Sequence, residues 1–188
     1  MKLGYLVCAT AMVAVSSTSA HEPMIVKDGD KRVIDVPFHE TRLILSEAAS
    51  EGGVSVYEFG LPPRTAGAPP HVHANEDEYG YILEGEVTVL AGEDVVTLGP
   101  GDFAALTRGA PHGFWNAGEE PARILFMVSK GGFERFFDAV AVRLREERPA
   151  SPDAANALVG EIAAAHGITM RPDLMPVEAA PYFAPPAD

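Results

Sequence analysis

The feature of this sequence that most constrains its fold is a series of short apolar stretches between residues 24 and 128, each closed by a cluster of turn residues. The stretches are too short for ordinary helices, and the clusters between them are rich in Gly and Pro. The expected strands include residues 43–45, 54–59, 79–83, 87–90, 95–98, 103–106, 113–115 and 123–128. Many short strands at even spacing with Gly-rich turns predict an antiparallel β-sandwich or barrel.

After residues 131–132 the spacing of apolar residues changes from two to three and four. One face of a helix then carries Phe133, Phe136, Phe137, Val140 and Leu144. A second helix is expected to begin at Ser151, as N-cap before Pro152, and to end at Gly167. We expect the Phe-rich face to pack on the barrel wall, and its alternative use is as a lid over a pocket. The Pro-rich tail from Pro172 is expected to be irregular.

The first twenty residues have the composition of a secretory signal peptide. Lys2 is followed by an apolar run over residues 3–15, too short to span a membrane, and then by small residues up to Ala20. Cleavage after Ala20 would remove Cys8 and leave a periplasmic or secreted product with His21 at its N-terminus, where a role in metal binding stays open. The predicted organisation is a signal peptide (1–20), a β-barrel (21–130), and a C-terminal helical extension with a Pro-rich tail (131–188).

Charge and composition exclude several classes of partner. The 27 acidic and 14 basic side chains give a formal net charge of −13, whereas nucleic-acid binding requires clustered Lys and Arg. The same sign disfavours an anionic membrane surface. A single cysteine excludes an internal disulfide and an all-thiolate zinc site. The expected partner is therefore a small molecule, and pairing of two copies through sheet edges would give a homodimer.

Four side chains of metal-ligand type lie within the predicted strand region. His71 and His73 are two residues apart, so on a strand both imidazoles point to one face. Glu78 opens the next strand, and His112 follows a later turn. Three imidazoles and one carboxylate suit one divalent ion of Fe, Ni, Mn, Co, Cu or Zn and leave positions open for a substrate. The histidines without such partners are expected to be surface or hydrogen-bonded core residues: His39 and His166.

The neighbours of these residues receive weaker assignments. Glu76 and Asp77 are expected to be solvated loop residues, although they could also add negative charge near the site. Alternation along the strand after His112 places Phe114 on the face of His112 and Trp115 on the opposite face.

Two motifs make this sequence similar to single-domain cupins of the quercetin dioxygenase-like type. The first motif of that family has two His, a Glu and a Gly, matched by His71, His73, Glu78 and Gly85. The second is matched by Gly101, Gly109, His112 and Asn116, with Thr107 where the family usually has Pro. The resemblance covers residues 43–128 and extends more loosely through the two predicted helices.

The resemblance implies a mainly β fold, a cupin jelly-roll barrel (double-stranded β-helix) with two C-terminal α-helices. It also implies that His71, His73, Glu78 and His112 hold the metal, and that Glu78 is catalytic, taking a phenolic proton from an enol or polyphenol that reacts with O2. One alternative is a non-catalytic cupin that binds a small ligand or a metal ion. Another is a different cupin chemistry, such as an isomerase or an oxalate-type oxidase. Because one barrel hosts many chemistries, these alternatives stay open.

Overall fold

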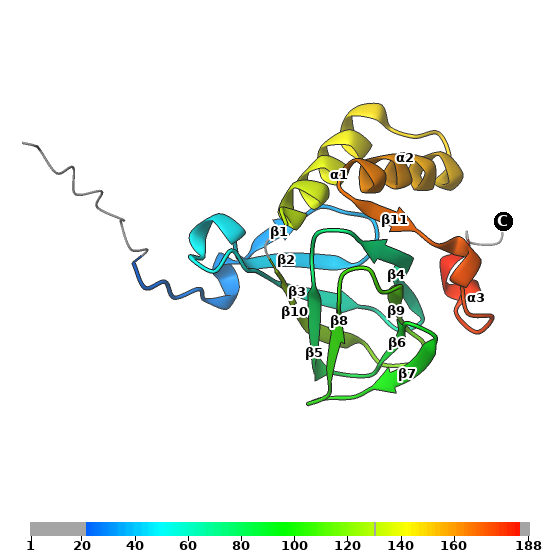
Figure 1. Cartoon of the computed structure of the whole chain (residues 1–188), viewed down its shortest axis with the longest axis horizontal. Coiled ribbons are helices and arrows are strands. Elements are labelled where there is room, and N and C mark those ends of the chain that lie inside the picture. Colours follow the sequence, from blue (N-terminus) through cyan, green and yellow to red (C-terminus); the bar gives the residue numbers. More distant parts are fainter. Residues whose placement is uncertain (1–21, 130, 185–188) are drawn as a thin grey trace, which may run out of the picture.

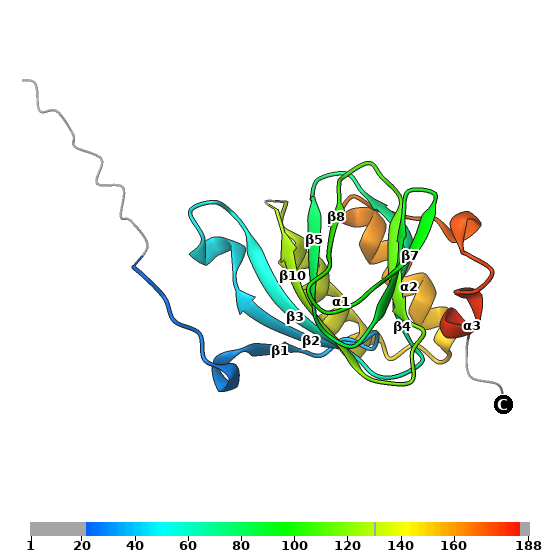
Figure 2. The same cartoon turned by 90° about the horizontal axis from the view of Figure 1, so that it is seen from below.

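Two antiparallel sheets face each other in the computed structural model, which describes residues 22–129 and 131–184 (Figures 1 and 2). The predicted signal peptide and His21 lie outside the described residues. The larger sheet has, in spatial order, β1 (Arg32–Ile34), β2 (Glu40–Leu45), β3 (Ser55–Leu61), β10 (Ala122–Val128), β5 (Glu78–Glu84) and β8 (Phe103–Leu106). The smaller sheet has β11 (Ile168–Met170), β4 (Thr65–His73), β9 (His112–Asn116), β6 (Val87–Ala91) and β7 (Asp94–Leu98). The predicted mainly β jelly-roll fold is confirmed.

All of the expected strands are present, and the structure adds strands that the sequence pattern did not indicate. β1 extends the edge of the larger sheet beside β2. β11 follows the second helix, in a segment expected to hold helices and a Pro-rich tail, and pairs with the end of β4. Its register places Ile168 opposite His73 and Met170 opposite His71. The strand that carries two predicted ligands is therefore hydrogen-bonded on both sides, to β11 and to β9.

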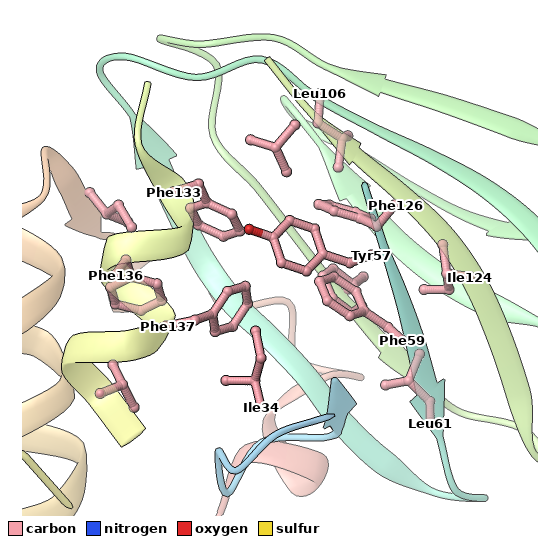
Figure 3. Close-up of a cluster of buried hydrophobic side chains, with 14 of the residues drawn as sticks. Ile34, Tyr57, Phe59, Leu61, Leu106, Ile124, Phe126, Phe133, Phe136 and Phe137 are labelled. Atoms are coloured by element: carbon pink, nitrogen blue, oxygen red, sulfur yellow. The ribbon is translucent and has the colours of Figure 1, made fainter. Parts of the chain in front are cut away.

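The barrel interior is filled by aromatic side chains (Figure 3). Residues along β3 alternate between buried and partly exposed, and this alternation directs Tyr57 and Phe59 inward. The Phe59 ring lies 4.8 Å from that of Phe126 on β10 and 6.2 Å from that of Phe114 on β9, between ring centroids. Full burial of each such side chain is worth about 1.5–3 kcal/mol. The rings therefore join the two sheets into one core.

Both predicted helices form, as α1 (Phe133–Glu147) and α2 (Pro152–Ala165). The Ser151 side chain caps α2 by accepting from the Ala154 N–H, and Gly167 ends the turn with a φ of 78°. α1 packs on β1 and α2, while α2 packs on β11, so the pair bridges one side of the barrel (Figure 1). The predicted Phe-rich face is buried. It contributes to the barrel interior as well as packing on the wall, because the ring centroid of Phe137 lies 5.5 Å from that of the interior residue Tyr57.

The tail after β11 is more ordered than its Pro-rich sequence suggests. It forms two short turns, η3 (Pro172–Leu174) and α3 (Ala180–Phe183). Trp115 is 2% exposed and points away from the barrel interior, as strand alternation predicts, and it is covered by Met175, Ala179, Tyr182 and Phe183 of this tail. Two further single turns precede β1 and β3, η1 (Asp28–Asp30) and η2 (Glu47–Ala49). Within the described ranges no helix has the length and apolar character needed to cross a membrane.

Candidate metal centre

The structure brings the four predicted ligands together at one end of the barrel interior. His71 and His73 end β4, Glu78 begins β5 and His112 begins β9. His112 lies directly opposite His71 in the β4–β9 pair. All four side chains are buried, with exposures between 0% and 7%, and one ligand atom from each lies within 4.8 Å of the others. Residues from three strands thus converge on one point.

The outer ring nitrogens of the three histidines each face an acceptor. Nδ1 of His71 donates to the Pro69 carbonyl at 2.8 Å, and Nδ1 of His112 donates to the Ala110 carbonyl at 3.0 Å. Nδ1 of His73 lies 3.0 Å from a carboxylate oxygen of Glu76. Carbonyl and ionised carboxylate oxygens only accept hydrogen bonds, so a neutral ring in any of these three positions carries its proton on Nδ1 and leaves Nε2 as a lone pair. Such outer partners fix the orientation of metal-binding histidines.

When all three rings are neutral in this way, the inner atoms are all acceptors. The Nε2 atoms of His71 and His73 are 3.0 Å apart, and Glu78 places one oxygen 3.2 Å from Nε2 of His73 and the other 3.0 Å from Nε2 of His112. Lone pairs so close together repel one another unless a proton or a metal ion lies between them. Ligand atoms about 2.0–2.2 Å from a metal, in adjacent positions, are themselves about 3 Å apart. The donor set and its spacing therefore fit one transition metal ion.

The electrostatics of the cluster also favour positive charge. Burial alone would lower the pKa of His73, but hydrogen bonds to Glu76 and Glu78 outweigh it and raise the pKa to about 9. Burial would raise the pKa of Glu78, yet hydrogen bonds from His112 and His73 hold it below its usual range. Burial lowers the pKa of His71 to about 3, with His112 adding to the effect, so this ring is neutral. The centre combines a carboxylate with an uncharged imidazole.

Glu76 differs from its sequence prediction. It was expected to be solvated, but it is 2% exposed and bonded to His73. Space for its side chain depends on Gly131, because a Cβ there would lie 2.4 Å from Glu76 Cγ. The signal in the sequence is a carboxylate three residues beyond a ligand histidine, where the chain turns back towards Glu78. Glu76 is therefore a positioning residue for His73.

Asp77 is partly exposed, as a loop residue should be, but it is also ion-paired. Its carboxylate accepts from the Arg108 backbone N–H at 2.9 Å and from the Arg108 guanidinium at 3.0 and 2.7 Å. The Arg108 side chain lowers the pKa of Asp77 to about 2. Beside this pair, the Gly109 N–H donates to the His73 carbonyl at 2.8 Å. These contacts tie the loop between His73 and Glu78 to the loop that precedes β9.

A helix closes the metal end of the barrel. The ring of Phe133, the first residue of α1, lies 5.3 Å from the ring of His73. A cavity of about 300 Å³ lies elsewhere and is lined by residues 33–41, Pro62 and Thr65. His39 borders that cavity, is partly buried and packs its ring 4.4 Å from that of Phe59, so it lies outside the metal cluster, as expected. His166 donates from Nδ1 to the Ile162 carbonyl at 2.8 Å and likewise stays outside the metal cluster.

Comparisons with known proteins agree with this architecture. A family model described as a cupin domain matches residues 57–128. The tetracenomycin polyketide synthase protein TcmJ of Streptomyces glaucescens is 30% identical over 123 residues, which make up 65% of this chain and 74% of that protein.

Two solved structures share the fold. A predicted oxalate decarboxylase from Thermotoga maritima is 22% identical, with a TM-score of 0.52 over 57% of this chain and 99% of that chain. KdgF from Halomonas sp. is 17% identical, with a TM-score of 0.51 over 57% of this chain and 94% of that chain. At these identities the two structures are evidence for the fold alone.

Proposed function

Because this chain belongs to the cupin family, we propose that it is a mononuclear metal-dependent enzyme that acts on a small enol or phenol. The observation that carries this proposal is the buried cluster of acceptor atoms. Three Nε2 lone pairs and the Glu78 carboxylate converge with their outer hydrogen bonds already satisfied. A ligand-free structural core would pair such groups with donors.

His71, His73, Glu78 and His112 would hold one divalent ion of Fe, Ni, Mn, Co, Cu or Zn. When bound, such an ion lowers the pKa of an enol or phenol hydroxyl that meets it. Glu78 is placed to accept the proton that this hydroxyl loses, since its two oxygens lie at the centre of the cluster. Burial of the cluster keeps bulk water away from the resulting anion.

Proton removal of this kind leads to two reaction types. If the enolate reacts with O2, the enzyme is a dioxygenase of the quercetinase kind, which is our first proposal. The second candidate is a cyclisation that needs no O2, and the likeness to a polyketide synthase protein favours it, since polyketide chains are rich in enolisable carbonyls. Glu78 would take up the proton in either reaction. We also propose that the enzyme works outside the cytoplasm, in keeping with residues 1–20.

The first test is elemental analysis of the mature protein, purified after export without chelators or a nickel column. Near-stoichiometric Fe, Ni, Mn, Co, Cu or Zn in the wild type, lost in Glu78→Ala and kept in His166→Ala, is the expected result. A protein that holds none of these ions and takes none up when they are added would overturn the enzyme proposal and leave a ligand-binding barrel.

The second test separates the two reactions. The metal-loaded protein is incubated with a flavonol and, separately, with a linear polyketide mimic, each under air and under argon. Turnover that consumes O2 and stops under argon supports the dioxygenase, and turnover that continues under argon supports the cyclisation. Ligand-induced stabilisation without product, in every combination, would contradict both and identify a binding module.

A further inference from the structure

The side chain that lies against the metal cluster is an aromatic ring from α1. Phe133 packs edge-on to His73, with ring centroids 5.3 Å apart and an interplanar angle of 67°. It also contacts Tyr57, with centroids 6.1 Å apart and the planes at 88°. An apolar ring thus fills the space between a ligand histidine and a tyrosine of the barrel interior.

The hydroxyl of Tyr57 has no hydrogen-bond partner in the described part of the chain, although the residue is fully buried. Figure 3 shows this hydroxyl pointing towards the Phe133 ring. Burial raises the pKa of Tyr57, and the nearby Ser55 hydroxyl offsets only part of that effect without completing a hydrogen bond. A buried donor without an acceptor is costly and rare in folded proteins, so it calls for an explanation.

The first turn of α1 is held by a small set of polar contacts on η2. Glu134 accepts from the Ser46 hydroxyl at 3.0 Å and from the Glu47 backbone N–H. The Gly132 N–H donates to the Glu47 carboxylate at 2.8 Å, and Gly132 has a φ of 87°, a conformation that favours glycine. Phe133 therefore enters the barrel from a glycine turn whose attachment depends on two glutamates.

We propose that Phe133 is a plug that occupies the position of the substrate's aromatic ring beside His73. A flat phenolic substrate displaces the plug, and the Tyr57 hydroxyl then donates its hydrogen bond to an oxygen of that substrate. This inference rests on the proposed function and adds a substrate class, an oxygenated aromatic ring, together with a specificity-determining residue, Tyr57. It accounts for both the unpaired hydroxyl and the closed metal end.

Weakening the attachment of α1 should make the site easier to enter. The apparent dissociation constant of a ligand equals its intrinsic value divided by the fraction of protein in the competent state, so a more frequently open plug gives tighter binding. Glu134→Ala removes the anchor without creating a hole beside His73, and Glu147→Ala, which removes an ion pair with Arg143 at the far end of α1, is the matched control. The probe is 4-nitrocatechol, whose absorbance shifts on binding, and the protein is loaded with zinc.

We expect Glu134→Ala to bind the probe about threefold to tenfold more tightly than the wild type, and Glu147→Ala to match the wild type. In the Glu134→Ala background, Tyr57→Phe should weaken binding severalfold, whereas Tyr79→Phe, on the opposite face of its sheet, should not. Equal affinities for Glu134→Ala and Glu147→Ala, or absence of binding by both, would overturn the plug. An unchanged affinity in Tyr57→Phe would overturn the role of the hydroxyl.

Two further measurements distinguish a failure of the plug from a failure of the metal site. The metal-free Tyr57→Phe protein should melt at the same temperature as the wild type or higher, because the substitution removes an unpaired hydroxyl and keeps the ring. Hydrogen exchange at the Gly132 amide should speed up when the probe binds the zinc-loaded wild type, and protection unchanged by a bound probe would contradict displacement of the plug. Zinc analysis of each variant shows whether the metal site itself is intact, so a failed plug and a failed metal site give different results.

Discussion

Each end of the barrel interior contains an imidazole, fully buried at His73 and partly buried at His39, and the two have different surroundings. At the metal end, His73 lies between the carboxylates of Glu76 and Glu78, which raise its pKa to about 9. At the other end, His39 lies 4.4 Å from Phe59 and 5.9 Å from Phe114, and burial lowers its pKa to about 4.

Burial acts to lower the pKa of both imidazoles, so burial does not decide which one can hold a cation. The carboxylates do, together with the acceptors that hold the outer nitrogens. At Nδ1, His39 meets only the Thr41 hydroxyl at 3.1 Å and the Glu40 carbonyl at 3.3 Å, and the Glu40 side chain is turned towards Arg42. The comparison teaches that the chemistry of a buried histidine is set by its nearest polar partners.

The largest effect that tests this comparison is loss of the metal when its carboxylate ligand is removed. Glu78→Ala should weaken metal binding by more than about 100-fold, since it deletes both converging oxygens and leaves no carboxylate among the three Nε2 atoms. His39→Phe should bind metal as the wild type does. Competition with a chromophoric chelator measures both affinities, and a similar loss in the two variants would show that the two ends are not independent.

The next effect tests Glu76, the carboxylate that bonds the outer nitrogen of His73 and lies outside the metal cluster. Glu76→Gln keeps the shape of the side chain but removes its charge. The His73 ring is then oriented less firmly, and its Nε2 is a weaker electron-pair donor to the metal. We expect metal affinity to fall about 10- to 100-fold. The matched control is Glu86→Gln, at an exposed position. Equal affinities for the two variants would mean that Glu76, although buried beside His73, does not position it for the metal.

The partly buried His39 predicts how the stability of the protein depends on pH. The folded pKa of His39, about 4, lies below its unfolded value of about 6.5, so the unfolded chain binds more protons between these values. Stability contributed by the neutral ring is complete above pH 6.5 and is lost as the pH falls towards 4. Between pH 7 and pH 5 this loss amounts to about 1–2 kcal/mol.

His39→Phe keeps a ring against Phe59 and has nothing to titrate, so its stability should decline less over the same range. Urea unfolding of the metal-free proteins at pH 7 and pH 5 measures the difference. Parallel declines in the wild type and the variant would mean that His39 is solvated and that burial does not lower its pKa.

Sequence patterns predicted most of this architecture because they depend on local rules. Strand alternation places Glu78, Phe114 and Trp115 on their observed faces, and the change of period marks α1. The same rules could not find β11, because three residues carry little periodic signal and this strand forms only by pairing with β4. They also missed Glu76, whose burial depends on Gly131, a residue distant along the chain. Contacts of this kind are settled by tertiary packing.

The smallest expected effect tests whether the metal end depends on its loops as well as on its ligands. Asp77 and Glu119 each pair with an arginine at the surface, Arg108 and Arg64, but only the Asp77 pair joins the two loops next to the ligands. Asp77→Asn loses the charge and one acceptor of that pair, so the metal should dissociate about two- to fivefold faster, and the effect should shrink at high salt. Glu119→Gln should dissociate metal at the wild-type rate. Stopped-flow mixing with a chelator measures both rates, and equal rates would mean that β4, β5 and β9 alone hold the ligands in place.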